Sequence, residues 1–290
     1  MAAKVIVMIN NKGGVGKTTL TTNLGDGLGR LGNNVLVIDL DPQGNSSSLL
    51  SPVNPERLGM NVGDLMMADD PLIHLGKCLI EETGFKRVNL LPANLRLDIQ
   101  AEEIHMKMFN ASFRLKKVVD EVKDLYDFII IDCPPRLSGV LPANALACAD
   151  HVIVPIESGD EFSISGLENV LVYVSRAKSQ LNPGMATPFC LMNKVSRRTL
   201  GAKQTEHALR TRVSEKADIE LLETSVPESV QAKNSLMART PIISYKDNTA
   251  IADAIRDLAD EVNHRVGGKP RVRGTGHKSK GHESTRVDAA

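Results

Sequence analysis

Short runs of apolar residues recur along the chain, and helix-like segments lie between most of them. The first run, Val5–Ile9, is rich in β-branched residues and holds no polar position, which is typical of a strand buried on both faces. Further runs lie at Val35–Asp39, Val88–Leu91, Phe128–Ile131, Val152–Val154, Phe189–Met192 and Ile219–Leu222. Strands that alternate with helices predict an α/β fold with a doubly wound, mostly parallel sheet flanked by helices.

Helical spacing of apolar positions is found in five of the intervening segments. We expect helices over 17–31, 114–125, 165–181, 203–216 and 250–265. Gly32 is expected to end the first of them, because glycine commonly follows the last helical turn. The stretch 42–87 is less regular and yields no assignment, and no internal repeat is found.

The apolar periodicity stops near Val266, where the composition also changes. Residues 267–290 are rich in Gly, Ser, Thr and charged residues. From Arg265 to Ala290 the net charge is +5, so residues 1–264 carry −5. We therefore expect one folded domain over 1–266 and a disordered basic tail over 267–290. The tail is either a solvated extension or an electrostatic arm that touches nucleic acid or a partner.

The composition excludes several classes of protein. The 35 basic residues balance the 35 acidic ones, so the whole chain is not a basic nucleic-acid binder, although a local basic face is possible. Aromatic residues make up only 3%, which disfavours base stacking. The four cysteines are widely spaced without a C-x-x-C pair, and no apolar run has the ~20 residues of a membrane span. These features favour a soluble protein of the reducing cytoplasm.

A glycine-rich loop follows the first predicted strand and precedes the first predicted helix. Gly13, Gly14 and Gly16 let backbone N–H groups converge on phosphate oxygens without a Cβ clash. Lys17 would place a positive charge on the phosphates, and the Thr18 hydroxyl is a ligand for Mg²⁺. The standard phosphate loop has glycine at position 11, whereas this chain has Asn11 followed by Lys12. Thr19 stands where a dinucleotide fingerprint needs its third glycine.

The loop KGGVGKTT resembles the deviant Walker A motif of the ParA/MinD branch of P-loop ATPases. DLDPQGN at 39–45 and FIIIDCPP at 128–135 resemble the second acidic motif and the Walker B strand of that family. TSVPESV at 224–230 and ARTPIISY at 238–245 also resemble its later segments, so the likeness covers about residues 3–263. The resemblance implies ATP and Mg²⁺ as ligands, with an ATP sandwich between two copies of the chain. The nucleotide would contact Lys12, Gly13, Gly14, Val15, Gly16, Lys17, Thr18 and Thr19.

Three aspartates follow predicted strands, at the edge where open α/β sheets bind ligands. By resemblance, Asp41 orients or activates the attacking water, and Lys12 reaches the nucleotide of the partner copy. Asp132 ends the Phe128–Ile131 run and is expected to hold Mg²⁺ through water, together with Thr18. Asp39 is expected either to support the metal site and its loop or to be a structural acid paired with a lysine or a backbone N–H.

The remaining site residues are assigned by resemblance or by default. By resemblance, Asn193 reads the adenine edge and the loop at Pro227 covers the base. Cys133, next to Asp132, is expected to be a small buried residue rather than a nucleophile.

The family resemblance also implies an output for the ATPase. Its ATP-bound dimer would bind DNA without sequence preference, and a ParB-like or other adaptor would stimulate slow hydrolysis. Such a switch segregates plasmid or chromosome DNA, or positions a large protein cargo on the nucleoid. The candidate DNA contacts are Arg197, Arg198, Lys203, Arg210, Arg212, Lys216, Lys233, Arg239 and Lys246.

Two alternatives from other classes remain open. A MinD-like spatial regulator would need a membrane-binding amphipathic tail, but residues 267–290 hold only two branched apolar residues, Val272 and Val287, so no membrane partner is expected. An iron–sulfur or metal-trafficking ATPase would need paired cysteines at the dimer interface. Cys133 and Cys148 do not resemble such a pair.

Overall fold

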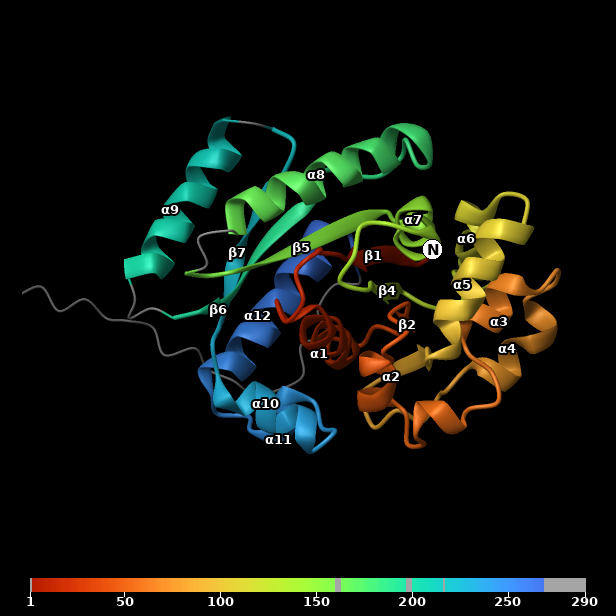
Figure 1. Cartoon of the computed structure of the whole chain (residues 1–290). Coiled ribbons are helices and arrows are strands. Elements are labelled where there is room, and N and C mark those ends of the chain that lie inside the picture. Colours follow the sequence, from red (N-terminus) through yellow and green to blue (C-terminus); the bar gives the residue numbers. More distant parts are fainter. Residues whose placement is uncertain (1, 160–162, 197–199, 216, 269–290) are drawn as a thin grey trace, which may run out of the picture.

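The computed structural model describes residues 2–159, 163–196, 200–215 and 217–268. Its centre is a sheet of seven parallel strands in the order β3-β2-β4-β1-β5-β6-β7 (Figure 1). The strands are β1 Lys4–Met8, β2 Val35–Asp39, β3 Val88–Leu91, β4 Phe128–Asp132, β5 His151–Glu157, β6 Phe189–Val195 and β7 Glu220–Pro227. The doubly wound parallel sheet predicted from the apolar runs is confirmed.

Helices cover both faces of this sheet. The α-helices are α1 Lys17–Arg30, α2 Asn45–Leu50, α3 Val62–Met67, α4 Leu72–Cys78, α5 Arg96–Lys107, α6 Arg114–Val122, α7 Val140–Cys148, α8 Ser163–Gln180, α9 Leu200–Glu215, α10 Val230–Met237, α11 Ile242–Tyr245 and α12 Ala250–Arg265. Short 3-10 turns lie at Pro55–Arg57 and Ala111–Phe113. Within the described residues, none of these helices is both long and apolar enough to cross a membrane.

Alternation along each strand divides the core into two parts. In β1, Val5 and Val7 face the layer that includes α5, α6, α7 and α8. Ile6 and Met8 face the layer that includes α1 and α12. Both sets are fully or almost fully buried, as expected of a strand in the middle of a parallel sheet.

Helices α1 and α12 approach each other unusually closely. A Cβ built on Gly27 of α1 would lie 2.7 Å from the Cβ of Ala259 in α12, so only glycine fits there. The Asn33 side chain, just beyond α1, donates to the Asn263 side chain across a separation of 230 residues. The first helix is therefore held in place by the end of the described chain.

Several elements differ from the sequence-based expectations. The edge strand β7 runs on to Pro227, beyond the apolar run at Ile219–Leu222, and β5 runs on to Glu157. The irregular stretch 42–87 contains α2, α3 and α4, and the pattern also missed α5, α7, α10 and α11. Helix α7 is almost entirely buried, so it has no polar face to create a helical period.

Candidate nucleotide-binding site

The glycine loop lies at the carboxyl edge of the sheet, between the central strand β1 and helix α1. Gly14 and Gly16 have φ values of +75° and +97°, in the left-handed region that favours glycine. A Cβ on Gly13 or Gly14 would meet no atom within 4 Å, so space is open above the loop. The loop therefore presents its backbone to a cavity, as the sequence predicts for a phosphate cradle.

Asn193 on β6 fixes the far side of this loop. Its Nδ2 donates to the Val15 carbonyl at 2.7 Å, and the residue is buried. A Cβ on Gly16 would lie only 2.4 Å from the same nitrogen. Sequence reasoning assigned Asn193 to the adenine edge. The structure places it on the cavity wall but uses its amide nitrogen to hold the loop.

Three oxygen-bearing side chains meet at the end of β4. The hydroxyls of Thr18 and Ser46 each donate to Asp132 Oδ2 at 2.7 Å. The other oxygen, Asp132 Oδ1, is buried and finds no hydrogen-bond partner among the described residues. An unpartnered buried carboxylate oxygen beside two hydroxyls is a donor set that suits a hard divalent cation such as Mg²⁺.

Asp39 pairs in register with Asp132 across the neighbouring strands β2 and β4. Its Oδ2 accepts the backbone N–H and the hydroxyl of Ser47, and its Oδ1 accepts the N–H of Asp41. Asp39 thus holds the loop that carries Asp41, and the structure gives it backbone N–H donors rather than a lysine.

Burial changes the acidity of both carboxyl groups. Burial, reinforced by the Asp132 carboxylate, raises the pKa of Asp39 to about 8. Burial also raises the pKa of Asp132 to about 6, although hydrogen bonds from Ser46 and Thr18 oppose the shift. Two negative charges are therefore unfavourable at this edge of the sheet unless a cation accompanies them.

Two lysines of the loop have different environments. Lys17 is buried, its Nζ donates to the Lys12 carbonyl at 3.1 Å, and burial lowers its pKa against the opposing effect of Asp132. The Lys12 ammonium instead points to Glu157 at the end of β5, at 3.0 Å. Lys194 pairs with the other oxygen of Glu157 at 3.3 Å. Lys17 is therefore fixed in the site, whereas Lys12 is held at its rim.

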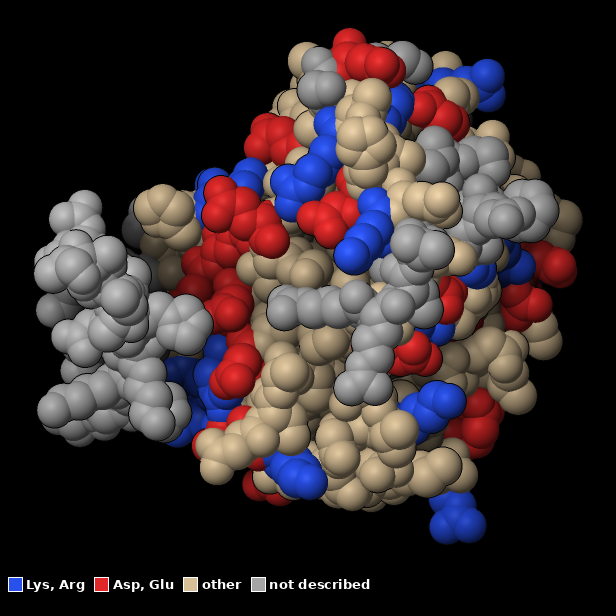
Figure 2. Space-filling model, turned by 90° about the vertical axis from the view of Figure 1, so that its left-hand side faces the viewer, with Lys and Arg blue, Asp and Glu red and all other residues tan. Residues whose placement is uncertain are grey.

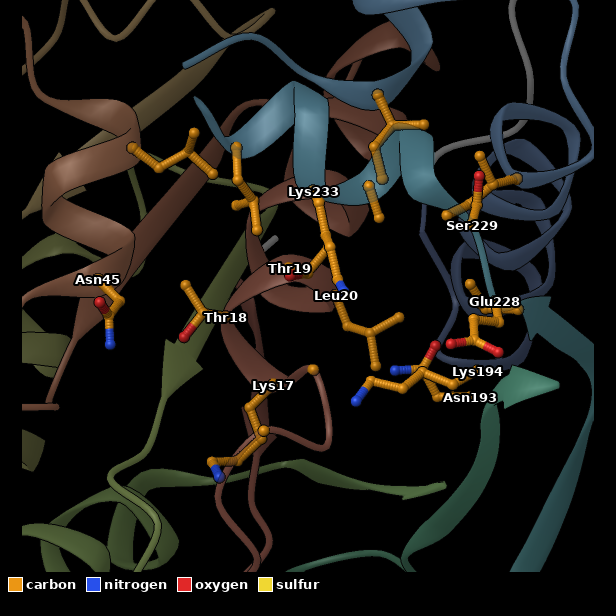
Figure 3. A pocket seen from close by; sticks show the side chains of 18 of the residues that line it. Lys17, Thr18, Thr19, Leu20, Asn45, Asn193, Lys194, Glu228, Ser229 and Lys233 are labelled. Carbon is orange, nitrogen blue, oxygen red and sulfur yellow. The ribbon is translucent and has the colours of Figure 1, made fainter. Parts of the chain in front are cut away.

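A cavity of about 940 Å³ opens above the loop. Figure 3 shows Lys17, Thr18 and Asn45 on one side of it and Asn193, Lys194 and Glu228 on the other. Its lining includes most of the predicted site: Gly13, Gly14, Gly16, Lys17, Thr18, Thr19, Asp41, Asn193 and Pro227. Lys12, Val15, Asp39 and Asp132 lie next to the cavity but are not among its lining residues.

The predicted DNA contacts do not form one set in the structure. Arg212 is a correction: it is buried, and its guanidinium is paired with Glu168 and Asp218, so it is not available to DNA. Lys203, Arg210 and Lys246 are exposed, with Arg210 paired to Glu206. Lys233 and Arg239 are exposed as well, and both line the cavity.

The remaining candidates, Arg197, Arg198 and Lys216, and residues 269–290 of the predicted tail lie outside the described residues. Figure 2 views the side of the molecule that carries α9 and β7. Basic and acidic side chains are interspersed on this face.

The cysteines and metal-binding groups do not suggest another chemistry. Cys133 is buried as expected, and burial raises the pKa of its thiol well above the usual value. Among the residues that the structure describes, no group of three or more His, Cys, Asp or Glu side chains could hold a metal ion.

Sequence reasoning missed four residues that build the site. Ser46 and Ser47 supply hydroxyls to the two buried aspartates, and Asn10 donates to the Pro155 carbonyl while accepting the Lys12 N–H. Glu157 holds Lys12. Their positions in the sequence could have indicated them. Asn10 follows β1, Glu157 ends β5, and Ser46 and Ser47 lie in the first turn of the helix after the second acidic motif.

A glycine loop that opens a helix beside a strand-end aspartate is the arrangement with which P-loop proteins hold nucleotide phosphates. The fold and this geometry therefore place the chain among the P-loop nucleotide-binding proteins.

Comparison with known proteins narrows this class. Residues 3–187 match the family model described as AAA domain. The sporulation initiation inhibitor protein Soj of Bacillus subtilis is 32% identical over 259 residues, which cover 89% of this chain and 98% of Soj. The chromosome-partitioning ATPase Soj of Treponema pallidum is 34% identical, over 91% of this chain and 98% of its own. The chain belongs to the ParA/Soj family of P-loop ATPases, as its motifs predict.

Solved structures agree with the fold. Cobyrinic acid a,c-diamide synthase from Mycobacterium smegmatis, with a bound ATP analogue and magnesium, has a TM-score of 0.75 at 26% identity, over 94% of this chain and 100% of that one. A putative plasmid partition protein from Borrelia burgdorferi bound to AMPPNP has a TM-score of 0.72 at 21% identity, over 91% and 99%. The latter likeness supports the fold alone.

Proposed function

We propose that this protein is a Mg²⁺-dependent ATPase switch whose ATP-bound form self-associates and binds DNA without sequence preference. The observation that carries the proposal is the junction of the glycine loop, the buried Lys17 and the Thr18–Asp132–Ser46 cluster. A bound phosphate, its charge-neutralising lysine and the cation would then lie next to one another.

The residues present fit both ligands. Backbone N–H groups of Gly13–Thr19 and the ammonium of Lys17 would hold the phosphates. The Thr18 hydroxyl and Asp132, whose Oδ1 has no partner in the described structure, would hold Mg²⁺. When bound, the cation neutralises charge that develops on the transferring phosphoryl group.

Hydrolysis would depend on Asp41 and on Lys12 of a second copy. Asp41 lies on the cavity wall, and its Oδ1 accepts the Gln43 N–H, which orients the carboxylate. The Lys12 side chain is 42% exposed, and its ion pair with Glu157 is therefore weak. Lys12 can leave this pair and reach the phosphates bound by a partner copy. Exposed apolar residues on and next to α5, Leu95 and Ile99, offer area for self-association near this edge.

We propose that the protein is cytoplasmic and associates with the nucleoid. Its output would be the transport or positioning of a cargo there. The relatives' names, Soj and chromosome-partitioning ATPase, support partition as the class of task. Of the candidates that the structure describes, Lys203, Arg210, Lys233, Arg239 and Lys246 are exposed, and the three that do not line the cavity, Lys203, Arg210 and Lys246, are the ones we assign to phosphate contacts. A ParB-like or other adaptor would stimulate the slow ATPase, and the cargo would be plasmid DNA, a chromosome or a large protein assembly. The basic residues after 267 would add a weak electrostatic contact.

The test is binding of the full chain to a random-sequence DNA duplex with ATP, ADP or no nucleotide, at two salt concentrations. We expect binding that requires ATP, falls steeply with salt and is lost in Lys17→Ala. Binding that is equal in all three nucleotide states, or that survives Lys17→Ala, would contradict the proposal. ATP binding without any DNA binding would retain the ATPase and reject DNA as its track.

A further inference from the structure

The cavity has a second cationic wall, opposite the phosphate loop. Lys233 on α10 and Arg239 in the turn after α10 both line the cavity. Within the part of the chain that the structure describes, neither side chain forms an ion pair or a hydrogen bond. The rim lysines Lys12 and Lys194, by contrast, are both paired with Glu157. The cations of α10 are therefore available to an anionic ligand.

The direction of the Lys233 side chain also favours an anionic ligand inside the cavity. Figure 3 shows its side chain running from α10 into the cavity, toward Thr19 and Leu20 in the first turn of α1. Lys233 is exposed, so water partly screens its charge, and an anion in the cavity would gain a modest attraction from its ammonium.

Helix α10 is held by few buried side chains. Ser235 is its one buried residue and Ala232 and Leu236 pack partly buried against the core, whereas Val230 and Met237 are 68% and 85% exposed. The next helix, α11, is tied to α1 because the Ile242 N–H donates to Asn23 at 2.8 Å. A helix with so little buried area opens at a low free-energy cost, and a ligand that contacts it can hold it in place.

We propose that Lys233 binds the nucleotide from the α10 side, and that this contact makes the order of α10 depend on nucleotide occupancy. The inference rests on the proposed nucleotide binding and reassigns Lys233 from DNA to the nucleotide. Lys233 lies between α1 and the wall formed by Asn193 and Glu228, whereas Thr18 and Asn45 lie on the other side (Figure 3). The contact would therefore be to the part of the nucleotide that ATP and ADP have in common.

The experiment measures ATP and ADP affinity of the full chain by calorimetry for wild type, Lys233→Met and Lys233→Arg. Lys77→Met is the matched control, because Lys77 is exposed on α4, does not line the cavity and has no role in the proposed function. We expect Lys233→Met to bind both nucleotides roughly threefold to tenfold more weakly, which is the loss of one charged contact. Lys233→Arg keeps the charge and should retain most of the affinity, and Lys77→Met should bind like wild type.

Hydrogen exchange gives a second measurement. ATP should protect amides of 229–238 in wild type and in Lys77→Met, and should protect them less in Lys233→Met at equal nucleotide saturation. Thermal unfolding without nucleotide should be the same for all four proteins, which excludes a general folding defect.

The results separate the two proposals. Unchanged nucleotide affinity in Lys233→Met, a loss confined to ATP, or a loss of DNA binding with normal nucleotide affinity would each overturn the role of Lys233. Wild-type protein that binds neither nucleotide would overturn the proposed ATPase function itself.

Discussion

Adding a methyl group at Gly16 should destabilise the glycine loop more than at its other glycines. Gly16→Ala would put an L-residue at φ +97° and a Cβ 2.4 Å from Asn193 Nδ2. The left-handed conformation costs about 1–2 kcal/mol for a residue with a side chain. Moving Asn193 aside breaks its hydrogen bond to Val15 and costs about 1 kcal/mol more. We expect the free energy of unfolding to fall by about 2–3 kcal/mol.

Gly13→Ala is the control, because a Cβ there meets nothing within 4 Å and the backbone is not left-handed. Urea unfolding followed by circular dichroism measures both variants and the double variant Gly16→Ala/Asn193→Ala. The double variant no longer has the clash, so its destabilisation should be about 1 kcal/mol smaller than the sum of the single changes. Equal stability of Gly16→Ala and Gly13→Ala, or strict additivity in the double variant, would refute the reasoning.

Three further predictions concern other parts of the molecule. Arg212→Met should lower the free energy of unfolding by about 1–2 kcal/mol, because it removes the buried guanidinium but leaves two carboxylates that are 39% and 53% exposed and can be hydrated, whereas Arg210→Met should change it by less than about 0.5 kcal/mol in the same urea titration. Cys133 should resist iodoacetamide at pH 8 in the folded protein and react in urea, since burial and the raised pKa suppress its thiolate; mass spectrometry reads out the label. Asp41→Ala should retain ATP binding but hydrolyse ATP about 100-fold more slowly in a phosphate-release assay, and wild-type turnover in this variant would remove Asp41 from the chemistry.

The sheet and the phosphate loop could be predicted from the sequence because both depend on local patterns. A run such as Val35–Ile38 has no polar position, and a strand covered on both faces needs no more information than that. Edge strand β7 was predicted too short because Glu223 and Thr224, exposed and half-buried at the edge, interrupt the apolar run. Helix α5 was missed because Ile99 and Met106, although exposed, blur its apolar face.

Long-range partners could not be predicted in this way. Arg212 resembles any surface cation in the sequence, and only the fold brings Glu168, 44 residues away, against it. Asn193 was assigned to the base by resemblance, but its contact with Val15 depends on β6 lying beside the loop. The motifs therefore identified the ligand, and the tertiary structure determined what each side chain is free to do.

The close contact between α1 and α12 has a consequence for synthesis of the protein. Helix α1 begins at the end of the glycine loop and packs closely against Ala259 through Gly27. The Asn33 side chain after this helix needs Asn263 as its hydrogen-bond partner. Contacts between residues so far apart in sequence form late and slow folding. In a nascent chain, α1 therefore cannot pack against α12 until residues near 265 have left the ribosome. Nucleotide binding should begin only after this point in translation.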